Sequence, residues 1–232
     1  MDVTKDFWFY YYNSNTIVGS DDLQKNVGRT KNGNPITPTE WNTILDYIQS
    51  QIKLDVNDNI IEVCCGNGLV IGELSKKCNE AVGIDYSDLL IEQLNNNYPN
   101  VKTILSDVME YQLDINTYNK AILYFAAQHF TERQLLKLIK NIISSLKENG
   151  ILLIGDIPDD TKKWNYISEP VHKKDYFQRL ENGVPKIGNW FNRNWFESLS
   201  FFIDGINVEI MEQPDYMINS NYRFDVLITK TK

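Results

Sequence analysis

The stretch Ile60-Ile61-Glu62-Val63-Cys64-Cys65-Gly66-Asn67-Gly68, followed by Ala81-Val82-Gly83-Ile84-Asp85, decides the fold. Each stretch is an apolar strand pattern with an acid near its end, and the first runs into a glycine turn that opens a helix pattern. Such a turn lets the backbone approach a ligand, and an acid at the tip of the next strand can accept both ribose hydroxyls. The two stretches predict a site for an adenosine-containing cofactor.

The spacing of the glycines distinguishes two cofactors that use this geometry. Gly66 and Gly68 are followed by Leu69-Val70-Ile71-Gly72, so the third glycine falls one place later than in the G-x-G-x-x-G turn of dinucleotide sites. Glu62 also lies within the motif, where a carboxylate can hold the amino group of an amino-acid moiety, which NAD lacks. The pattern favours an amino-acid-bearing cofactor, with a nicotinamide-dependent oxidoreductase as the alternative.

At this point the chain resembles a family. Glu62-x-Cys64-x-Gly66-x-Gly68 is similar to motif I of the class I S-adenosylmethionine-dependent methyltransferases, E/D-x-G-x-G-x-G, with Cys64 in place of the first glycine. The resemblance covers roughly Thr37 to Lys230. Its other landmarks follow in order, namely Asp85, Ser106-Asp107-Val108, Ala121 to Phe125, and Lys147 to Ile154. It implies S-adenosylmethionine as the methyl donor and S-adenosylhomocysteine as the product.

The resemblance also implies roles for individual residues. Glu62 would hold the methionine amino group, Asp85 the ribose and Asp107 the adenine amino group, while the Val108 amide meets the adenine ring and Tyr86 packs on it. Purely structural alternatives stay open, because Glu62 could only order the glycine turn, Tyr86 could cover the sheet edge and Asp107 could cap a helix. The remaining residues expected to line the cofactor are Cys64, Gly66, Gly68 and Phe125.

The N-terminal part carries a looser resemblance. Asn26-Val27-Gly28-Arg29-Thr30 with Gly33-Asn34-Pro35-Ile36, together with the Cys-Cys-Gly-Asn-Gly form of motif I, is similar to a subgroup of small bacterial methyltransferases that often modify surface polysaccharides or other glycans. This implies a carbohydrate acceptor, as a sugar or a phosphorylated or nucleotide-linked sugar, and a lid over the cofactor formed by residues 1–36. Gly28 and Thr30 become two further candidate cofactor-binding residues.

Alternating strand and helix patterns predict an α/β fold built around a doubly wound, mainly parallel seven-stranded sheet. Thr37-Pro38-Thr39-Glu40 has the signature of a capped helix start. The expected strands are 59–64, 80–85, 101–106, 120–125, 150–157 and an antiparallel C-terminal pair at 207–212 and 223–229, and the expected helices include 69–77, 87–97, 131–146 and 192–202. The methyltransferase domain would span 37–232, with an insert at about 158–190 for the substrate.

A hydroxyl acceptor requires a general base, and the chain has two histidines. His129 follows the fourth expected strand and is the preferred base, although a histidine there could serve a structural role. His172 in the insert and Asp156 at the tip of the fifth strand are further catalytic candidates, each with a solvated or structural alternative. The insert region also interleaves cations with aromatic rings suited to sugars or phosphates, namely Lys173, Lys174, Arg179, Lys186 and Arg193 with Trp164, Tyr166, Tyr176, Trp190 and Trp195.

Composition restricts the partners. The 232 residues carry a formal charge of −8, which disfavours a nucleic-acid substrate. Three cysteines and two histidines show no disulfide or zinc-site spacing, so we expect reduced thiols, no metal and a cytoplasmic protein without a membrane span. The favoured function is O-methylation of a small polar acceptor; the alternatives are N-methylation of a small amine and a non-catalytic module that binds S-adenosylmethionine.

Overall fold

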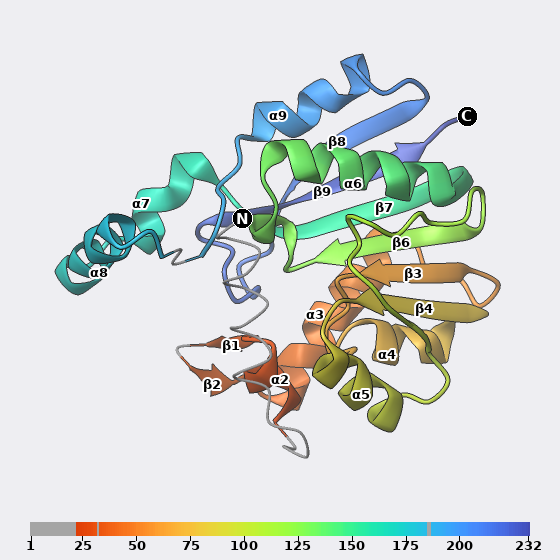
Figure 1. Cartoon of the computed structure of the whole chain (residues 1–232), viewed down its shortest axis with the longest axis horizontal. Coiled ribbons are helices and arrows are strands. Elements are labelled where there is room, and N and C mark those ends of the chain that lie inside the picture. The colour runs from red at the N-terminus through yellow and green to blue at the C-terminus, as the bar shows by residue number, and fades with distance from the viewer. Residues whose placement is uncertain (1–21, 32, 185–186) are drawn as a thin grey trace.

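A computed structural model describes residues 22–31, 33–184 and 187–232 and contains the predicted sheet (Figure 1). Its strand order is β5-β4-β3-β6-β7-β9-β8; pairings from β5 to β7 are parallel, and β9 runs antiparallel to both neighbours. The bounds are β3 Asn59–Val63, β4 Glu80–Asp85, β5 Lys102–Leu105, β6 Tyr118–Tyr124, β7 Leu146–Pro158, β8 Ile206–Glu212 and β9 Arg223–Lys230. The α/β class and the antiparallel C-terminal pair are confirmed.

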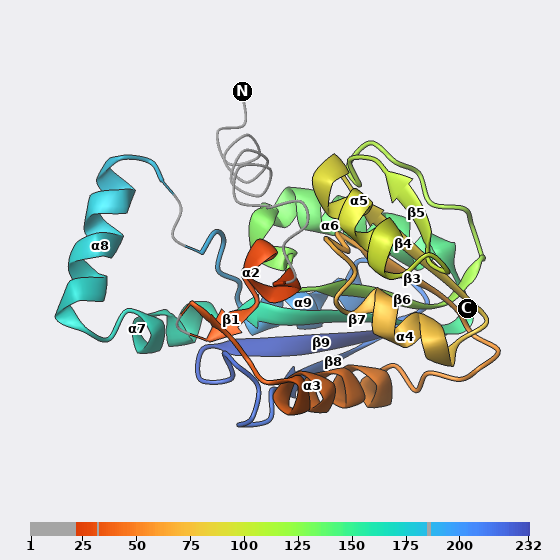
Figure 2. The ribbon, with the colours of Figure 1, turned by 90° about the horizontal axis from the view of Figure 1, so that it is seen from below.

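Helices cover both faces of the sheet, as Figures 1 and 2 show. Strand side chains alternate between the faces: Ile60 and Ile122 join the core under α3, α4 and α5, whereas Ile61 and Ala121 join the core under α6 and α9. Both cores are therefore continuous across several strands. The helices are α3 Pro38–Gln51, α4 Ile71–Leu74, α5 Asp88–Asn97, α6 Glu132–Ser145 and α9 Arg193–Glu197.

The helix starts follow from capping chemistry. The Thr37 side chain accepts from the Glu40 amide while the Glu40 carboxylate accepts from the Thr37 amide, so the predicted start of α3 is confirmed. Thr131 and Gln134 form the same reciprocal pair at α6. The helix expected at 69–77 is shorter, because α4 ends at Leu74 and the chain continues as a 3₁₀ turn over Ser75–Lys77.

Three neighbouring strands end in residues with left-handed backbone conformation. Cys64 follows β3 with φ +60°, Phe125 follows β6 with φ +63°, and Asp156 lies in the irregular end of β7 with φ +57°. A non-glycine residue in this region costs roughly 1–2 kcal/mol. Since β3, β6 and β7 are adjacent, this strain is concentrated at one edge of the sheet, at the carboxyl ends of its parallel strands.

A buried carboxylate joins α3 to the C-terminal half of the sheet. Asp225 of β9 is fully buried, and its Oδ2 accepts from the hydroxyls of Tyr47 and Tyr124, each at 3.0 Å. Its Oδ1 accepts from the Asp156 amide at 2.7 Å and from Gln213 Nε2 at 2.8 Å. Burial raises the pKa of Asp225 to about 6 despite these four donors.

Two segments stand outside the sheet and its helices. The N-terminal segment contains α2 (Leu23–Asn26) and a short hairpin of β1 (Thr30–Lys31) and β2 (Asn34–Pro35). The insert contains α7 (Lys163–Tyr166) and α8 (Pro170–Glu181), which project away from the sheet in Figure 2. The aromatic run at 7–12 and Lys186, both noted in the sequence, lie outside the described residues. No helix among those described is long and apolar enough to span a membrane.

Candidate cofactor site

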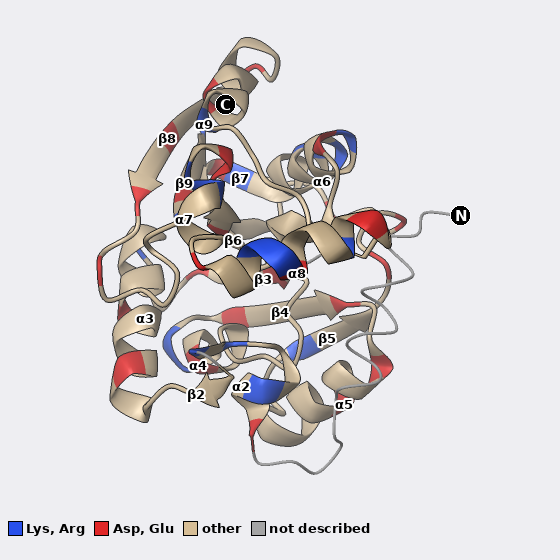
Figure 3. Ribbon diagram, turned by 90° about the vertical axis from the view of Figure 1, so that its left-hand side faces the viewer, with Lys and Arg blue, Asp and Glu red and all other residues tan. Residues whose placement is uncertain are grey.

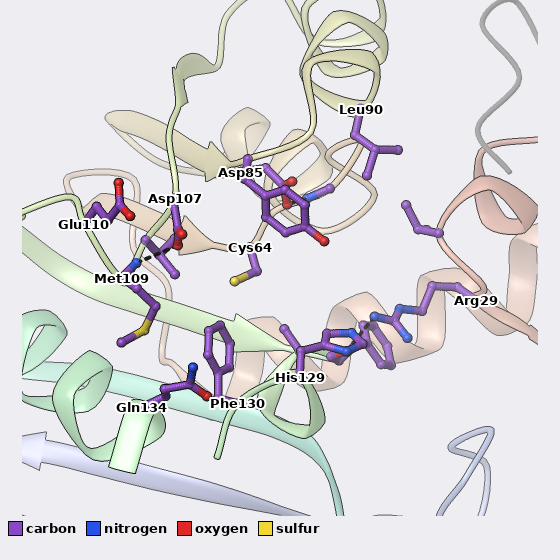
Figure 4. Close-up of a pocket in the computed structure, with 16 residues that line it drawn as sticks. Arg29, Cys64, Asp85, Leu90, Asp107, Met109, Glu110, His129, Phe130 and Gln134 are labelled. Carbon is purple, nitrogen blue, oxygen red and sulfur yellow. Dashed lines mark hydrogen bonds between the residues drawn. The ribbon is translucent and has the colours of Figure 1, made fainter. Parts of the chain in front are cut away.

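A cavity of about 480 Å³, the cofactor cavity, lies at the carboxyl ends of the parallel strands and under the N-terminal segment (Figure 4). Eight of the candidate site residues line it, namely Cys64, Gly66, Asp85, Tyr86, Asp107, Val108, Phe125 and His129. Eight further lining residues were not predicted, namely Val27, Arg29, Leu90, Met109, Glu110, Ala126, Phe130 and Gln134. Residues from the ends of four strands (β3, β4, β5 and β6), from α5 and α6, and from the N-terminal segment thus meet at one site.

Gly66 and Gly68, the two glycines of motif I, have different structural roles. Gly66 has φ +54°, lines the cavity, and donates its amide to Asp85 Oδ2 at 2.9 Å. Gly68 has φ +80° and faces α5 instead, where an added Cβ would lie 1.8 Å from Leu94 Cδ1. Gly66 therefore brings backbone to the ligand, whereas Gly68 lets the turn pack closely on α5.

Two carboxylates lie in the cavity wall. Asp85 accepts from the Gly66 amide and, through Oδ1, from the Ser87 amide at 3.0 Å, and burial raises its pKa. Asp107 Oδ1 accepts from the Met109 amide at 2.9 Å, which shapes the turn that presents Val108 (Figure 4). Each carboxylate retains acceptor capacity, since an ionised carboxylate offers about four lone-pair sites. The contacts to ribose and adenine stay predictions.

Glu62 lies just behind the cavity wall. Its Oε2 accepts from the Ile71 amide at 2.9 Å and so holds the first turn of α4. Burial raises the pKa of Glu62 to about 8, although the Ile71 amide and the Arg29 guanidinium both act to lower it. The structural role considered for this residue is therefore present, and its contact with a ligand amino group remains a prediction.

Arg29 is the principal residue that the sequence analysis missed. Its Nη2 donates to the Phe125 carbonyl at 2.8 Å, its guanidinium lies 3.8 Å from the Phe125 ring centroid, and Figure 4 shows it reaching toward His129. The flanking candidates do not line the cavity: Gly28 supplies a left-handed turn at φ +67° and Thr30 begins β1. The signal in the sequence was a cation inside the Asn-Val-Gly-Arg-Thr stretch, whose charge was not considered.

A buried asparagine of motif I anchors the N-terminal segment. Asn67 is fully buried, and its Nδ2 donates to the Leu23 carbonyl at 2.9 Å and to Gln93 Oε1 at 3.2 Å. This side chain links the glycine turn to α2 and α5. The Asn-Gly part of motif I and the N-terminal stretch, which share a resemblance in sequence, are thus joined physically.

Of the three catalytic candidates, the structure brings His129 to the cavity. Burial, with the guanidiniums of Arg29 and Arg223, lowers the pKa of His129 to about 3, so its imidazole is neutral at physiological pH. His172 is exposed on α8, where it stacks on Tyr166 with a centroid distance of 6.4 Å. Asp156 is buried and forms an ion pair with Arg223 at 2.9 Å.

Comparison with known proteins agrees with this arrangement. Residues 60–150 match a family described as a methyltransferase domain. The curated relatives include O-methyltransferase 12 of Dictyostelium discoideum, 27% identical over 188 residues covering 76% of this chain and 48% of that protein. Another is the carboxy-S-adenosyl-L-methionine synthase of Nautilia profundicola, 31% identical over 134 residues covering 55% of this chain and 56% of that protein. The chain thus spans about half the length of these relatives.

Solved structures share the fold. The magnesium protoporphyrin IX methyltransferase of Synechocystis PCC 6803, crystallised with bound S-adenosylhomocysteine, is 11% identical, with a TM-score of 0.63 and coverage of 98% of this chain and 99% of that one. A Leishmania major S-adenosylmethionine-dependent methyltransferase is 13% identical, with a TM-score of 0.67 and coverage of 98% and 82%. The sheet topology, the cavity at its strand ends and the methyltransferase domain matched over residues 60–150 indicate a class I S-adenosylmethionine-dependent methyltransferase.

Proposed function

We propose that this protein transfers a methyl group from S-adenosylmethionine to a hydroxyl of a small polar acceptor, and that this acceptor is a carbohydrate. The observation that carries the cofactor assignment is the distribution of charge in and around the cofactor cavity. Asp85 and Asp107 lie along one wall for the ribose and adenine, and Arg29 with Glu62 offers a cation and an acid for a zwitterionic amino acid. This donor set fits S-adenosylmethionine.

The geometry supports roles for these residues in binding. The Arg29 guanidinium can hold the methionine carboxylate, because it is a charged donor that lines the cavity and uses only some of its N–H groups on the Phe125 carbonyl. Glu62 retains a carboxylate oxygen for the ammonium beyond the one that the Ile71 amide uses. The bound cofactor supplies an activated methyl on a positive sulfonium, so the chain has mainly to align the nucleophile and exclude water.

His129 is the proposed contact for the acceptor. A neutral imidazole can accept a hydrogen bond from a hydroxyl and so orient its oxygen toward the methyl group. When the oxygen–methyl bond forms and the sulfur takes the electron pair of the broken bond, the hydroxyl proton passes to His129 or water. A carboxylate on Arg29 would offset the guanidinium that lowers the pKa of His129, which makes the imidazole more basic in the loaded site.

N-methylation of a small amine is the second candidate, and the low pKa of His129 favours it. A group with a pKa of about 3 is a weak base, and a neutral amine needs positioning more than proton removal before it attacks. The two readings predict different effects of His129→Asn. O-methyl transfer would fall by roughly 100-fold or more, whereas N-methyl transfer would change little.

Calorimetry with S-adenosylhomocysteine tests the cofactor assignment. Arg29→Met and Asp85→Asn should each weaken binding by roughly 10- to 100-fold, as expected for loss of a charge-assisted hydrogen bond. Lys31→Met and Asp88→Asn are matched controls, because both side chains are exposed, lie within three residues of the tested positions, and do not line the cavity. Equal affinities in tested and control variants, or binding of NAD instead, would refute the assignment.

Transfer itself is tested with labelled S-adenosylmethionine and a fractionated extract of small molecules. The compound that gains the label identifies the acceptor and the methylated atom. Tight binding of S-adenosylhomocysteine without any labelled product would favour a non-catalytic binding module over an enzyme.

A further inference from the structure

A second cavity, of about 180 Å³, lies within the insert, and we call it the insert cavity. It is lined by α7, α8 and residues 184 and 187–190, on the part of the molecule that projects from the sheet in Figure 2, where α8 carries basic residues (blue in Figure 3). Its polar lining groups are Lys163 and Arg179, and its aromatic lining residues are Tyr166, Tyr176 and Trp190. None of these residues belongs to the cofactor cavity.

The charged residues of the insert cavity determine which charge a ligand there would carry. The Lys163 ammonium lies 4.6 Å from the Tyr176 ring centroid and 5.9 Å from that of Trp190, and it donates to the Tyr176 hydroxyl at 2.8 Å. Ring faces that already hold an ammonium do not attract a second cation. Arg179 adds a positive charge, and its ion pair with Asp175 at 2.9 Å is solvent-exposed and readily exchanged. The cavity therefore favours an anion.

The rings provide flat apolar faces next to these cations. Trp190, Tyr166 and Tyr222 form a cluster with centroid distances between 4.8 and 6.2 Å. Aromatic side chains pair an apolar face with a polar tip, which suits the C–H face and the hydroxyl rim of a sugar ring. An anion with a neighbouring sugar ring fits both sets of groups.

Hydrogen bonds join the insert cavity to the cofactor cavity. Gly188, in the wall of the insert cavity, packs so closely that an added Cβ would lie 2.3 Å from the Gln128 carbonyl oxygen. Asn189 donates its amide to that oxygen at 2.8 Å and its Nδ2 to the Phe130 carbonyl at 2.9 Å. Phe130 and its neighbour His129 line the cofactor cavity. One short segment, residues 187–190, thus connects the walls of the two cavities.

We propose that the insert cavity binds the phosphate-bearing part of a sugar phosphate acceptor, with Lys163 and Arg179 holding the phosphate and Trp190 stacking on the sugar ring. This inference rests on the proposed methyl transfer to a carbohydrate. It assigns the charged end of the acceptor to the insert and leaves the reacting hydroxyl on the side of His129. The phosphate can be terminal or part of a nucleoside diphosphate, and the probes below distinguish these sources.

Fluorine NMR of protein labelled with 5-fluorotryptophan tests the proposal in the presence of saturating S-adenosylhomocysteine. The probes are glucose 1-phosphate, N-acetylglucosamine 1-phosphate and their uridine diphosphate forms, at millimolar concentration. We expect a saturable shift of the Trp190 signal, assigned with Trp190→Phe, and no shift of Trp195, which packs on Phe191 and Phe196 and lines neither cavity. A lower half-saturation concentration for the diphosphate forms would identify a nucleotide-linked acceptor.

Variants separate this site from general charge effects. Lys163→Met and Arg179→Gln should each raise the half-saturation concentration by roughly tenfold or more, whereas Lys173→Met, an exposed lysine of α8 outside the cavity wall, should not. Unchanged S-adenosylhomocysteine affinity and melting temperature establish that each variant is folded. No Trp190 shift with any sugar phosphate, or an equal shift with methyl glucoside or choline, would overturn the proposal. The cofactor assignment would still stand if S-adenosylhomocysteine binds.

Discussion

Protonation of Glu62 should make cofactor binding depend on pH. With a pKa of about 8, roughly nine-tenths of the Glu62 side chains are protonated at pH 7 before ligand binds. A ligand ammonium against this group stabilises the carboxylate and lowers its pKa. If the pKa returns to its ordinary value of 4.5, binding at pH 7 releases about 0.9 proton.

The energy involved follows from the same shift. A change in pKa from about 8 to 4.5 corresponds to about 5 kcal/mol of coupling between the ligand and the ionised form of Glu62. The affinity for S-adenosylhomocysteine should then rise by about tenfold per pH unit between about pH 6 and pH 7.5. The affinity rises with pH because, below its pKa, Glu62 must lose a proton before it can pair with the ligand ammonium.

Calorimetry in phosphate and in Tris at one pH measures the released protons, since the two buffers differ in ionisation enthalpy. Glu62→Gln keeps an oxygen for the Ile71 amide but cannot ionise, so it should bind more weakly and release no proton. Glu80→Gln is a matched control, because Glu80 begins β4 at the end away from Asp85 and the cofactor cavity, where it pairs with Lys102. Identical proton release by the wild type and Glu62→Gln would refute the reasoning and favour a role for Glu62 in ordering the glycine turn alone.

The remaining predictions concern packing, stability and rate. Gly68→Ala should destabilise the protein by roughly 2–5 kcal/mol, because φ is positive there and the added Cβ would overlap Leu94. Gly183→Ala should cost only about 1 kcal/mol, because Gly183 has a φ of +66° but an added Cβ would meet no neighbour. Urea unfolding measures both, and equal costs would contradict the packing argument. The pKa of Asp225 is about 6 in the folded protein and 3.8 ordinarily, so its protonation contributes at most about 3 kcal/mol to the free energy of unfolding. This contribution is complete below about pH 4 and is lost as the pH rises through 6. Urea midpoints that change with pH in parallel in the wild type and in Asp225→Asn would contradict this prediction. In the unliganded protein His129 has a pKa of about 3 and is already neutral at pH 5, so kcat/KM for methyl transfer, which reports the free enzyme, should show no inflection near pH 6.5. An inflection in kcat/KM that His129→Asn abolishes would disprove this.

Much of the fold could be predicted because its elements are long, periodic and capped. The strand expected at 80–85 has those bounds in the structure, and the helix expected at 131–146 begins after its Thr131 cap and ends at Ser145. The helices of the insert could not be predicted in this way. No side chain of α8 is buried, so its sequence lacks the apolar stripe that marks a packed helix.

The residues of the candidate site were likewise predictable only where they follow a regular sequence pattern. Asp85 and Asp107 were identifiable because each follows a strand pattern, and the carboxyl ends of parallel strands meet at one edge. Arg29 and Phe130 could not be placed from local pattern, since their positions depend on contacts such as those of Arg29 with Phe125 across 96 residues. The basic and aromatic set of the insert also separated on folding: Arg179, Tyr166, Tyr176 and Trp190 line the insert cavity, whereas Arg193 pairs with Asp159 and Glu212.

The left-handed residues at the ends of β3, β6 and β7 limit how this protein can change over evolutionary time. Together Cys64, Phe125 and Asp156 hold roughly 3–6 kcal/mol of conformational strain, against a total stability of about 5–15 kcal/mol for an ordinary domain. New side chains at the ligand edge would be tolerated only while the cores beneath remain intact. Variants with new acceptors should therefore arise first in the insert, where no helix carries this strain.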